Sequence, residues 1–121
     1  MIDEISIIIP AYNAEKTIEK SLELILKETS KFQSEIIVVD DKSTDKTCEI
    51  VKTFKNIKLI QLENNLGAGN ARNTGADNSK YETLCFIDAD IEISKENSIL
   101  NLIERLYKTD ETGSVCATQD L

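Results

Sequence analysis

The chain has 121 residues, of which 40% are hydrophobic, so it can bury the core of one compact domain and is too short for two. Its 22 acidic and 14 basic residues give a formal net charge of -8, which disfavours nucleic acid as a partner. Three widely spaced cysteines and the lack of histidine indicate a reduced compartment. No apolar stretch is long enough to cross a bilayer. We expect a single domain over residues 1–121 in the cytoplasm, where the complete protein could work at the cytoplasmic face of a membrane.

The first third of the chain predicts a strand, a helix and a second strand. Residues 5–10 are mostly β-branched and apolar, and Pro10 should end this strand because it lacks the N–H that a central strand donates. Asn13 can cap a helix over residues 14–28, whose apolar side chains recur at the spacing of one buried stripe. Residues 35–40 are apolar almost throughout, without alternation, which is typical of a strand covered on both faces.

The same alternation continues to the end of the chain. Polar residues 43–45 can cap a short helix, and further strands are expected over residues 57–62, 82–87 and 114–118. Helices are expected around residues 72–76 and after Ser94. The order predicts an α/β fold with a mostly parallel sheet and helices on both faces, truncated after about the fifth strand. In such a sheet, the residues that follow the first, second and fourth strands meet at one edge.

An acidic pair, Asp88 and Asp90, flanks one small residue at the end of the predicted fourth strand. Carboxylate oxygens are the ligands that Mg²⁺ and Mn²⁺ prefer, and such ions bridge diphosphate oxygens. Taken alone, the pair could equally be a turn with caps. Its place at the shared sheet edge favours a metal site.

A second acidic pair, Asp40 and Asp41, closes the predicted second strand at the same edge. Asp40 could accept a hydrogen bond from a nucleobase N–H, whereas Asp41 and the polar residues after it also fit turn and helix-cap chemistry. Tyr12 lies in the turn after the first strand, between Pro10 and Asn13, and offers a flat face for a base. Ordinary hydrophobic packing is the alternative for Tyr12.

Gly67 and Gly69 look like the start of a dinucleotide-binding turn, but they follow the third strand, and Arg72 stands where that pattern needs glycine. The sequence therefore argues against an NAD site. Arg72 offers a planar guanidinium for a phosphate or a base carbonyl, with a surface salt bridge as the alternative. Asn73 and Gly75 could serve only the close packing of this helix.

Four stretches together resemble the family 2 inverting glycosyltransferases of GT-A fold, in the part that binds the nucleotide sugar. They are SIIIPAYN (6–13), IVVDDKSTD (37–45), NLG with ARN and Gly75 (65–75), and FIDAD (86–90). Their order and spacing agree with the family, and they cover the chain to about residue 93. Lys42 departs from the small residue that is usual there, which leaves only the local turn in doubt.

The resemblance implies a nucleoside-diphosphate sugar as donor, commonly a UDP-sugar, and a carbohydrate, lipid or protein as acceptor. The implied donor-binding residues are Pro10, Tyr12, Asn13, Asp40, Asp41, Gly67, Arg72 and Asp88. Asp90 would hold Mn²⁺ or Mg²⁺ between the donor phosphates, where the cation would stabilise the departing nucleoside diphosphate, and Asp88 would face the ribose or the metal. Transfer would then occur with inversion, by in-line attack of an acceptor hydroxyl on the anomeric carbon.

No catalytic residue is assigned, because the family has its general base in a downstream acidic motif, which we expect beyond residue 121. Glu92 and Glu96 fit the role of helix-start acids better. We therefore expect a truncated chain that binds the donor, transfers poorly and could self-associate through an exposed sheet edge.

Three other functions are alternatives to a glycosyltransferase. A non-catalytic nucleotide-binding or assembly module stays open for this chain. A sugar nucleotidyltransferase should have a Gly-rich basic loop after the first strand, which residues 10–13 lack. A phosphoacceptor receiver domain would need an acidic pair after the first strand and an aspartate after the third, and the sequence has neither.

Overall fold

The computed structural model describes residues 4–30, 33–89 and 114–117. Within these ranges the chain forms one parallel five-stranded sheet with the strand order β3-β2-β1-β4-β5. The elements are β1 (Glu4–Ala11), α1 (Ile18–Thr29), β2 (Gln33–Asp40), α2 (Thr47–Val51), β3 (Ile57–Gln61), α3 (Ala68–Asp77), β4 (Leu84–Ile87) and β5 (Ser114–Ala117).

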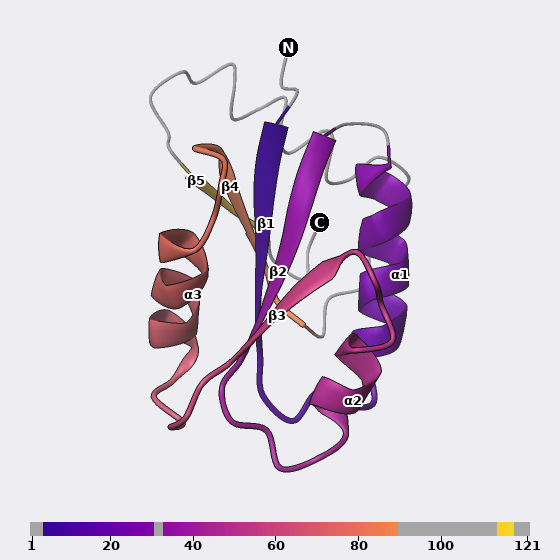
Figure 1. Cartoon of the computed structure of the whole chain (residues 1–121), viewed down its shortest axis with the longest axis vertical. Helices are drawn as coiled ribbons and strands as arrows, with labels where there is room; N and C mark the ends of the chain where they lie inside the picture. Colours follow the sequence, from indigo (N-terminus) through magenta and orange to yellow (C-terminus); the bar gives the residue numbers. More distant parts are fainter. Residues whose placement is uncertain (1–3, 31–32, 90–113, 118–121) are drawn as a thin grey trace.

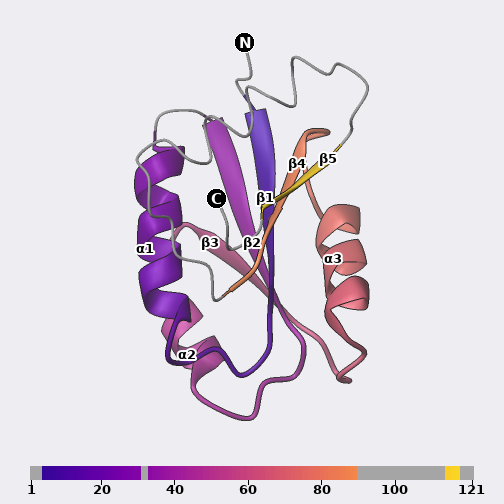
Figure 2. The same ribbon diagram turned by 180° about the vertical axis from the view of Figure 1, so that it is seen from behind.

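Helices cover both faces of this sheet. Helices α1 and α2 lie on one face and α3 lies on the other, as Figures 1 and 2 show from opposite sides. The larger core cluster joins the odd-numbered isoleucines of β1 to the buried stripe of α1, which contains Ile18, Leu22 and Ile25. The predicted α/β class with a parallel sheet and helices on both faces is therefore confirmed. Among the described helices, none combines the length and apolarity that crossing a bilayer would require.

The direction of the chain across the sheet reverses once. From β1 the chain moves through β2 to the edge strand β3, and it then crosses by way of α3 to β4 on the other side of β1. In open parallel sheets, such a reversal leaves a crevice at the carboxyl ends of the two strands concerned. The candidate site is thus expected between the ends of β1 and β4, toward the lower part of Figure 1.

Pro10 does not end the first strand, contrary to the sequence-based expectation. The Ser6 N–H donates to the Thr83 carbonyl at 2.9 Å, so the even-numbered positions of β1 direct their N–H groups toward β4. Registered pairing with β4 stops at Ile8, whereas pairing with β2 continues to Ala11. The N–H that Pro10 lacks would face β4, with which registered pairing has already ended. Because pairing with β2 does not need this N–H, the strand continues through Pro10.

The first helix begins four residues later than predicted, at Ile18 rather than residue 14, and Asn13 does not cap it. Thr17 occupies the N-cap position without a side-chain bond to the helix. Asn13 instead adopts a left-handed backbone conformation with φ 48°, which asparagine tolerates better than most residues. Its side chain bonds to the loop after β2, so a tertiary contact replaces the expected cap.

The other boundaries differ by small amounts. β2 begins at Gln33, two residues early, and β4 begins at Leu84, two residues late. The short helix α2 begins at Thr47 and its N-cap is Lys46, without a side-chain cap, rather than one of the predicted residues 43–45. Asp45 lies one residue earlier, where its Oδ1 accepts the Thr47 N–H and hydroxyl. The helix expected after Ser94 lies outside the described residues.

Candidate functional site

A pocket of about 640 Å³ lies at the carboxyl edge of the sheet, where β1 and β4 end. Its walls come mainly from the loop after β1 and from the turn after β4. The lining residues are Pro10, Tyr12, Asn13, Ala14, Glu15, Lys16, Thr17, Asp45, Ala68, Asp88 and Ala89. Tyr12 is 51% exposed, so an aromatic face is available to a ligand at this edge.

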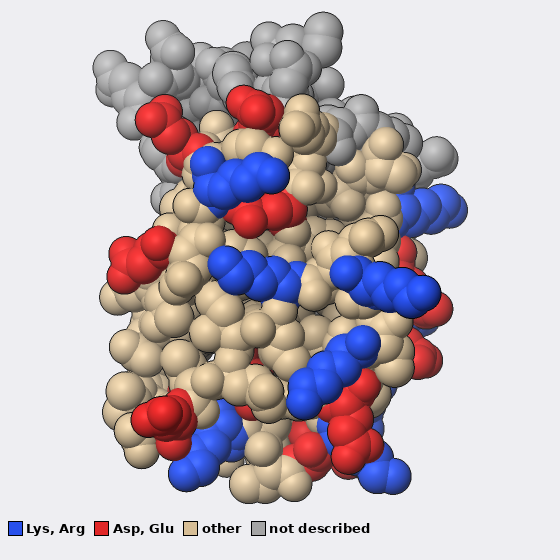
Figure 3. All heavy atoms as spheres, viewed as in Figure 1, with Lys and Arg blue, Asp and Glu red and all other residues tan. Residues whose placement is uncertain are grey.

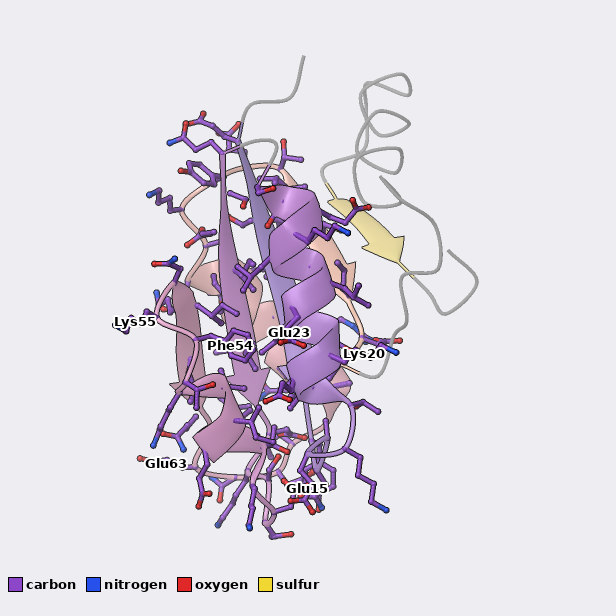
Figure 4. The ribbon with its side chains drawn as sticks, turned by 90° about the vertical axis from the view of Figure 1, so that its right-hand side faces the viewer. Glu15, Lys20, Glu23, Phe54, Lys55 and Glu63 are labelled. Carbon is purple, nitrogen blue, oxygen red and sulfur yellow. The ribbon has the colours of Figure 1, made fainter. Side chains whose placement is uncertain are left out.

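Several lining residues were missed by sequence reasoning. The helix expected from residue 14 would include Glu15, Lys16 and Thr17. Charged side chains on a helix normally form its solvent-exposed face. Because the helix starts only at Ile18, they belong to the loop that forms one wall of the pocket. Figure 4 shows Glu15 at this end of the molecule, beyond the start of α1. The sequence did give one signal, because these residues follow soon after a predicted strand end, where ligand-binding loops lie in parallel sheets.

Asp88 and Arg72 form an ion pair across the end of the sheet. The Arg72 Nη2 atom lies 3.5 Å from Asp88 Oδ1, with side-chain exposures of 37% and 42%. Arg72 comes from α3, and Asp88 follows β4, so two residues chosen from the sequence do meet. The Arg72 Nε is buried without a protein partner, which leaves one donor of the guanidinium unused among the described contacts.

Few candidate ligands for a cation lie beside Asp88 among the described residues. Asp88 contributes one carboxylate to the pocket, and Asp90 lies outside the described residues. The described part of the chain has no group of three or more acidic, cysteine or histidine ligands. Mg²⁺ is commonly held by one or two carboxylates together with substrate phosphates and waters, so a separate protein cage is not required.

Two hydroxyls, Ser21 of α1 and Thr17 at its N-cap, anchor the turn that follows Asp88. Ser21 Oγ donates to the Ala89 carbonyl at 2.9 Å, and Thr17 Oγ1 donates to the same oxygen at 3.3 Å. Ala89 is only 8% exposed. Because one carbonyl oxygen can accept two bonds, both donors are used, and the backbone next to Asp88 is tied to α1.

Asp40 is buried at the end of β2, with 2% exposure, and does not line the pocket. Its Oδ2 accepts the Ser43 N–H at 2.9 Å, and its Oδ1 accepts the Ser43 hydroxyl at 2.5 Å. These bonds hold the carboxylate in one orientation. Each oxygen keeps further lone pairs, so the acceptor role expected of Asp40 stays a prediction.

The pKa of the Cys48 thiol is affected by its burial and by the neighbouring Asp40 carboxylate. Burial, followed by the hydrogen bond to Asp40 and the Asp40 charge, raises the pKa of the Cys48 thiol from 9.0 to about 11. Deprotonation would place a thiolate in a partly buried site beside the Asp40 carboxylate, and for this reason the pKa of Cys48 is raised.

We expect Cys48 to react with iodoacetamide at pH 8 about a hundredfold more slowly than an unperturbed thiol, because a two-unit rise in pKa reduces the thiolate population by that factor. The rate should keep rising with pH toward 11, and Asp40→Asn should shift the profile to lower pH. Peptide mapping by mass spectrometry separates the cysteines, and buried Cys85 controls for unfolding. An unchanged profile in Asp40→Asn would contradict this cause.

Asp41 holds the loop between β3 and α3. Its Oδ1 accepts the Leu66 N–H at 3.0 Å and its Oδ2 accepts the Gly67 N–H at 2.9 Å, while the residue is 4% exposed. Gly67 is the N-cap of α3 and has φ 99°, a conformation that favours glycine. Asp41 therefore fixes the start of the helix that carries Arg72. Neither Asp41 nor Gly67 lines the pocket.

The loops after β1 and β2 are bonded to each other. The Ala14 N–H donates to Thr47 Oγ1 at 2.8 Å, and the Glu15 N–H donates to Asp45 Oδ2 at 3.2 Å. Slight burial raises the pKa of Asp45, but hydrogen bonds from Thr47 and Glu15 outweigh it, and the net shift is downward. Lys42 adopts φ 61°, a left-handed conformation that favours glycine.

Charged side chains of both signs surround this edge. On the face seen in Figure 3, basic and acidic groups lie next to one another at the lower end, and the central basic side chains are separated by neutral surface. The net charge of -8 is therefore not gathered into one patch on that face.

The sequence profile described as Glycosyl transferase family 2 matches residues 6–120. Poly(ribitol-phosphate) beta-N-acetylglucosaminyltransferase TarS of Staphylococcus aureus (strain Mu50 / ATCC 700699) is 41% identical over 96 residues, which cover 75% of this chain and 17% of TarS.

Two solved structures share the fold. The crystal structure of S. aureus TarS 1–349 in complex with UDP-GlcNAc matches with a TM-score of 0.72 at 33% identity, over 88% of this chain and 31% of that one. The mannosyltransferase PcManGT from Pyrobaculum calidifontis, in complex with GDP-Man and Mn²⁺, matches with a TM-score of 0.71 at 28% identity, over 84% and 32% respectively. The chain thus spans a third or less of the length of these proteins.

Proposed function

The chain belongs to glycosyl transferase family 2, and from this premise we propose that it binds a nucleoside-diphosphate sugar, with UDP as the preferred nucleotide, for a glycosyltransferase reaction. The observation that carries the proposal is the pocket at the ends of β1 and β4, whose lining includes both Tyr12 and Asp88. The structure of TarS in complex with UDP-GlcNAc supports the choice of UDP.

The proposed roles follow the chemistry of each group. Tyr12 stacks on the base, and Asp40 accepts a hydrogen bond from the uracil N3–H. Arg72 holds the nucleotide through its guanidinium, which Asp88 already orients at 3.5 Å. Pro10, Asn13, Asp41 and Gly67 act mainly by shaping the loops around the donor.

We assign the metal to Asp88 and Asp90. The structure of PcManGT with Mn²⁺ supports a divalent ion, and Asp88 supplies a carboxylate at the pocket. When bound, Mn²⁺ or Mg²⁺ would neutralise part of the charge that develops on the departing diphosphate. The Ala89 carbonyl, bonded to Ser21 and Thr17, keeps the adjoining backbone in place for this role.

The reaction that we propose is transfer with inversion at the anomeric carbon. A hydroxyl of a carbohydrate, lipid or protein acceptor attacks that carbon as its bond to the diphosphate oxygen breaks, and a carboxylate base takes the hydroxyl proton. We place the reaction in the cytoplasm, on the basis of the reduced, widely spaced cysteines.

Calorimetric titration with UDP, with and without Mn²⁺, tests the proposal. We expect Mn²⁺ to tighten binding and Asp90→Ala to remove at least about tenfold of the affinity, since loss of a ligand carboxylate leaves the shared ion poorly held. Asp77→Ala, which removes an exposed carboxylate at the end of α3, is the matched control and should bind as the wild type does. Absence of UDP binding, or binding indifferent to both Mn²⁺ and Asp90, would overturn the donor site.

A further inference from the structure

Ser43 stands between the two residues assigned to the nucleobase. The Asn13 N–H donates to Ser43 Oγ at 2.8 Å, and the Ser43 hydroxyl donates to Asp40 Oδ1 at 2.5 Å. The Ser43 N–H also donates to Asp40 Oδ2 at 2.9 Å. One residue therefore connects the carboxylate of β2 to the loop that carries Tyr12.

The direction of these bonds is set by their chemistry. A backbone N–H can only donate, so Ser43 Oγ accepts from Asn13 and spends its single proton on Asp40. Asn13 is held from the other side as well, because its Oδ1 accepts the Thr44 N–H at 2.8 Å. The loop after β1 is thus bonded to the loop after β2 in both directions, directly beside Tyr12.

We propose that Ser43 is a positioning residue for base recognition, which holds the Asp40 carboxylate in one orientation and keeps the Tyr12 loop in register with it. This inference rests on the proposed binding of UDP. Asp40 is only 2% exposed and each of its oxygens accepts a bond from Ser43, so Ser43 sets the orientation in which the carboxylate presents its remaining lone pairs. An aligned carboxylate also discriminates between pyrimidines, because uracil N3 carries a proton to donate and cytosine N3 does not.

The experiment compares UDP and CDP binding in saturating Mn²⁺. We expect Ser43→Ala to lower the ratio of UDP to CDP affinity by about tenfold, whereas Ser43→Thr, which keeps the hydroxyl, retains the wild-type ratio. Ser30→Ala is the control, because among the described residues the Ser30 hydroxyl bonds to the Lys27 carbonyl, at the exposed end of α1. Ser43→Cys, with a weak donor and acceptor, should give an intermediate ratio and carries the test if Ser43→Ala does not fold.

The outcomes separate this inference from the proposed function. If the wild-type chain binds UDP and Ser43→Ala leaves the ratio of UDP to CDP affinity unchanged, the positioning role is overturned and the donor site is not. Equal losses of UDP and CDP affinity in Ser43→Ala would have the same meaning. A wild-type chain that binds neither nucleotide would overturn the proposed function itself. A fall in the ratio together with an unchanged dependence on Mn²⁺ would support the role, because a general loosening of the fold would weaken both.

Discussion

Asp41→Ala is expected to lower the free energy of unfolding by about 3 kcal/mol, the largest effect that we predict for a single side chain here. The Asp41 carboxylate accepts the Leu66 and Gly67 N–H groups at 3.0 Å and 2.9 Å, in a residue that is 4% exposed. Bonds to an ionised acceptor are stronger than neutral ones, and alanine would leave two donors without partners. The loop before α3 should therefore loosen first.

Urea denaturation measures the global loss, and amide hydrogen exchange measures the local one. Exchange should accelerate at Leu66 and Gly67 in Asp41→Ala, and Asp41→Asn should be intermediate because an amide offers one acceptor oxygen in place of two. Asp77→Ala again serves as a matched loss of an acid on the surface. Similar stability of the Asp41 and Asp77 variants would show that the two bonds contribute little.

Gly75→Ala is expected to destabilise the domain by about 2 kcal/mol, because α3 packs too closely on the sheet to accommodate a methyl group. A Cβ at this position would lie 2.4 Å from Ile8 Cγ2 and 3.2 Å from Val39 Cγ2. Both neighbours belong to buried strands, so the clash cannot be relieved at a free side-chain end. The close-packing role considered for Gly75 from the sequence is the one that the structure supports.

Gly69→Ala is the matched control in the same helix. Beyond its own helix and chain neighbours, no atom of the described residues lies within 4 Å of a Cβ built there, so alanine should stabilise α3 by about 0.5 kcal/mol through reduced backbone entropy in the unfolded chain. In thermal or urea denaturation, the free energy of unfolding should therefore fall for Gly75→Ala and rise for Gly69→Ala. Ile8→Ala combined with Gly75→Ala should cost less than the sum of the two single changes, and strict additivity would argue against the clash.

The two changes affect the same helix at different points. Asp41 holds the N-cap residue Gly67, and Gly75 seats the later turns against Ile8. Arg72 lies between these points and reaches Asp88 across the end of the sheet. The pairing of Arg72 with Asp88 thus depends on structural contacts that make no use of the pocket.

The sequence by itself determined the repeating elements and the family. Continuous apolar runs such as 35–40 predicted buried parallel strands, and four stretches in order predicted the fold that the glycosyl transferase family 2 profile supports. Short-range chemistry was readable in part, since Asp45 accepts the Thr47 N–H at the start of α2 although Lys46 is the N-cap. These features depend on neighbouring residues, so local pattern was sufficient.

The sequence predicted the shared edge, but only the tertiary structure decided which residues of its loops line the pocket. The strand order places β4 beside β1, so the turn at Asp88 and the loop at Tyr12 line the same pocket. The same distant contacts moved the start of the first helix to Ile18 and gave Asp41 its place under the loop at Gly67. Each of these is a pairing between segments more than 20 residues apart, as with Asp41 and Gly67 at 26, and local sequence pattern carries no information on such pairings.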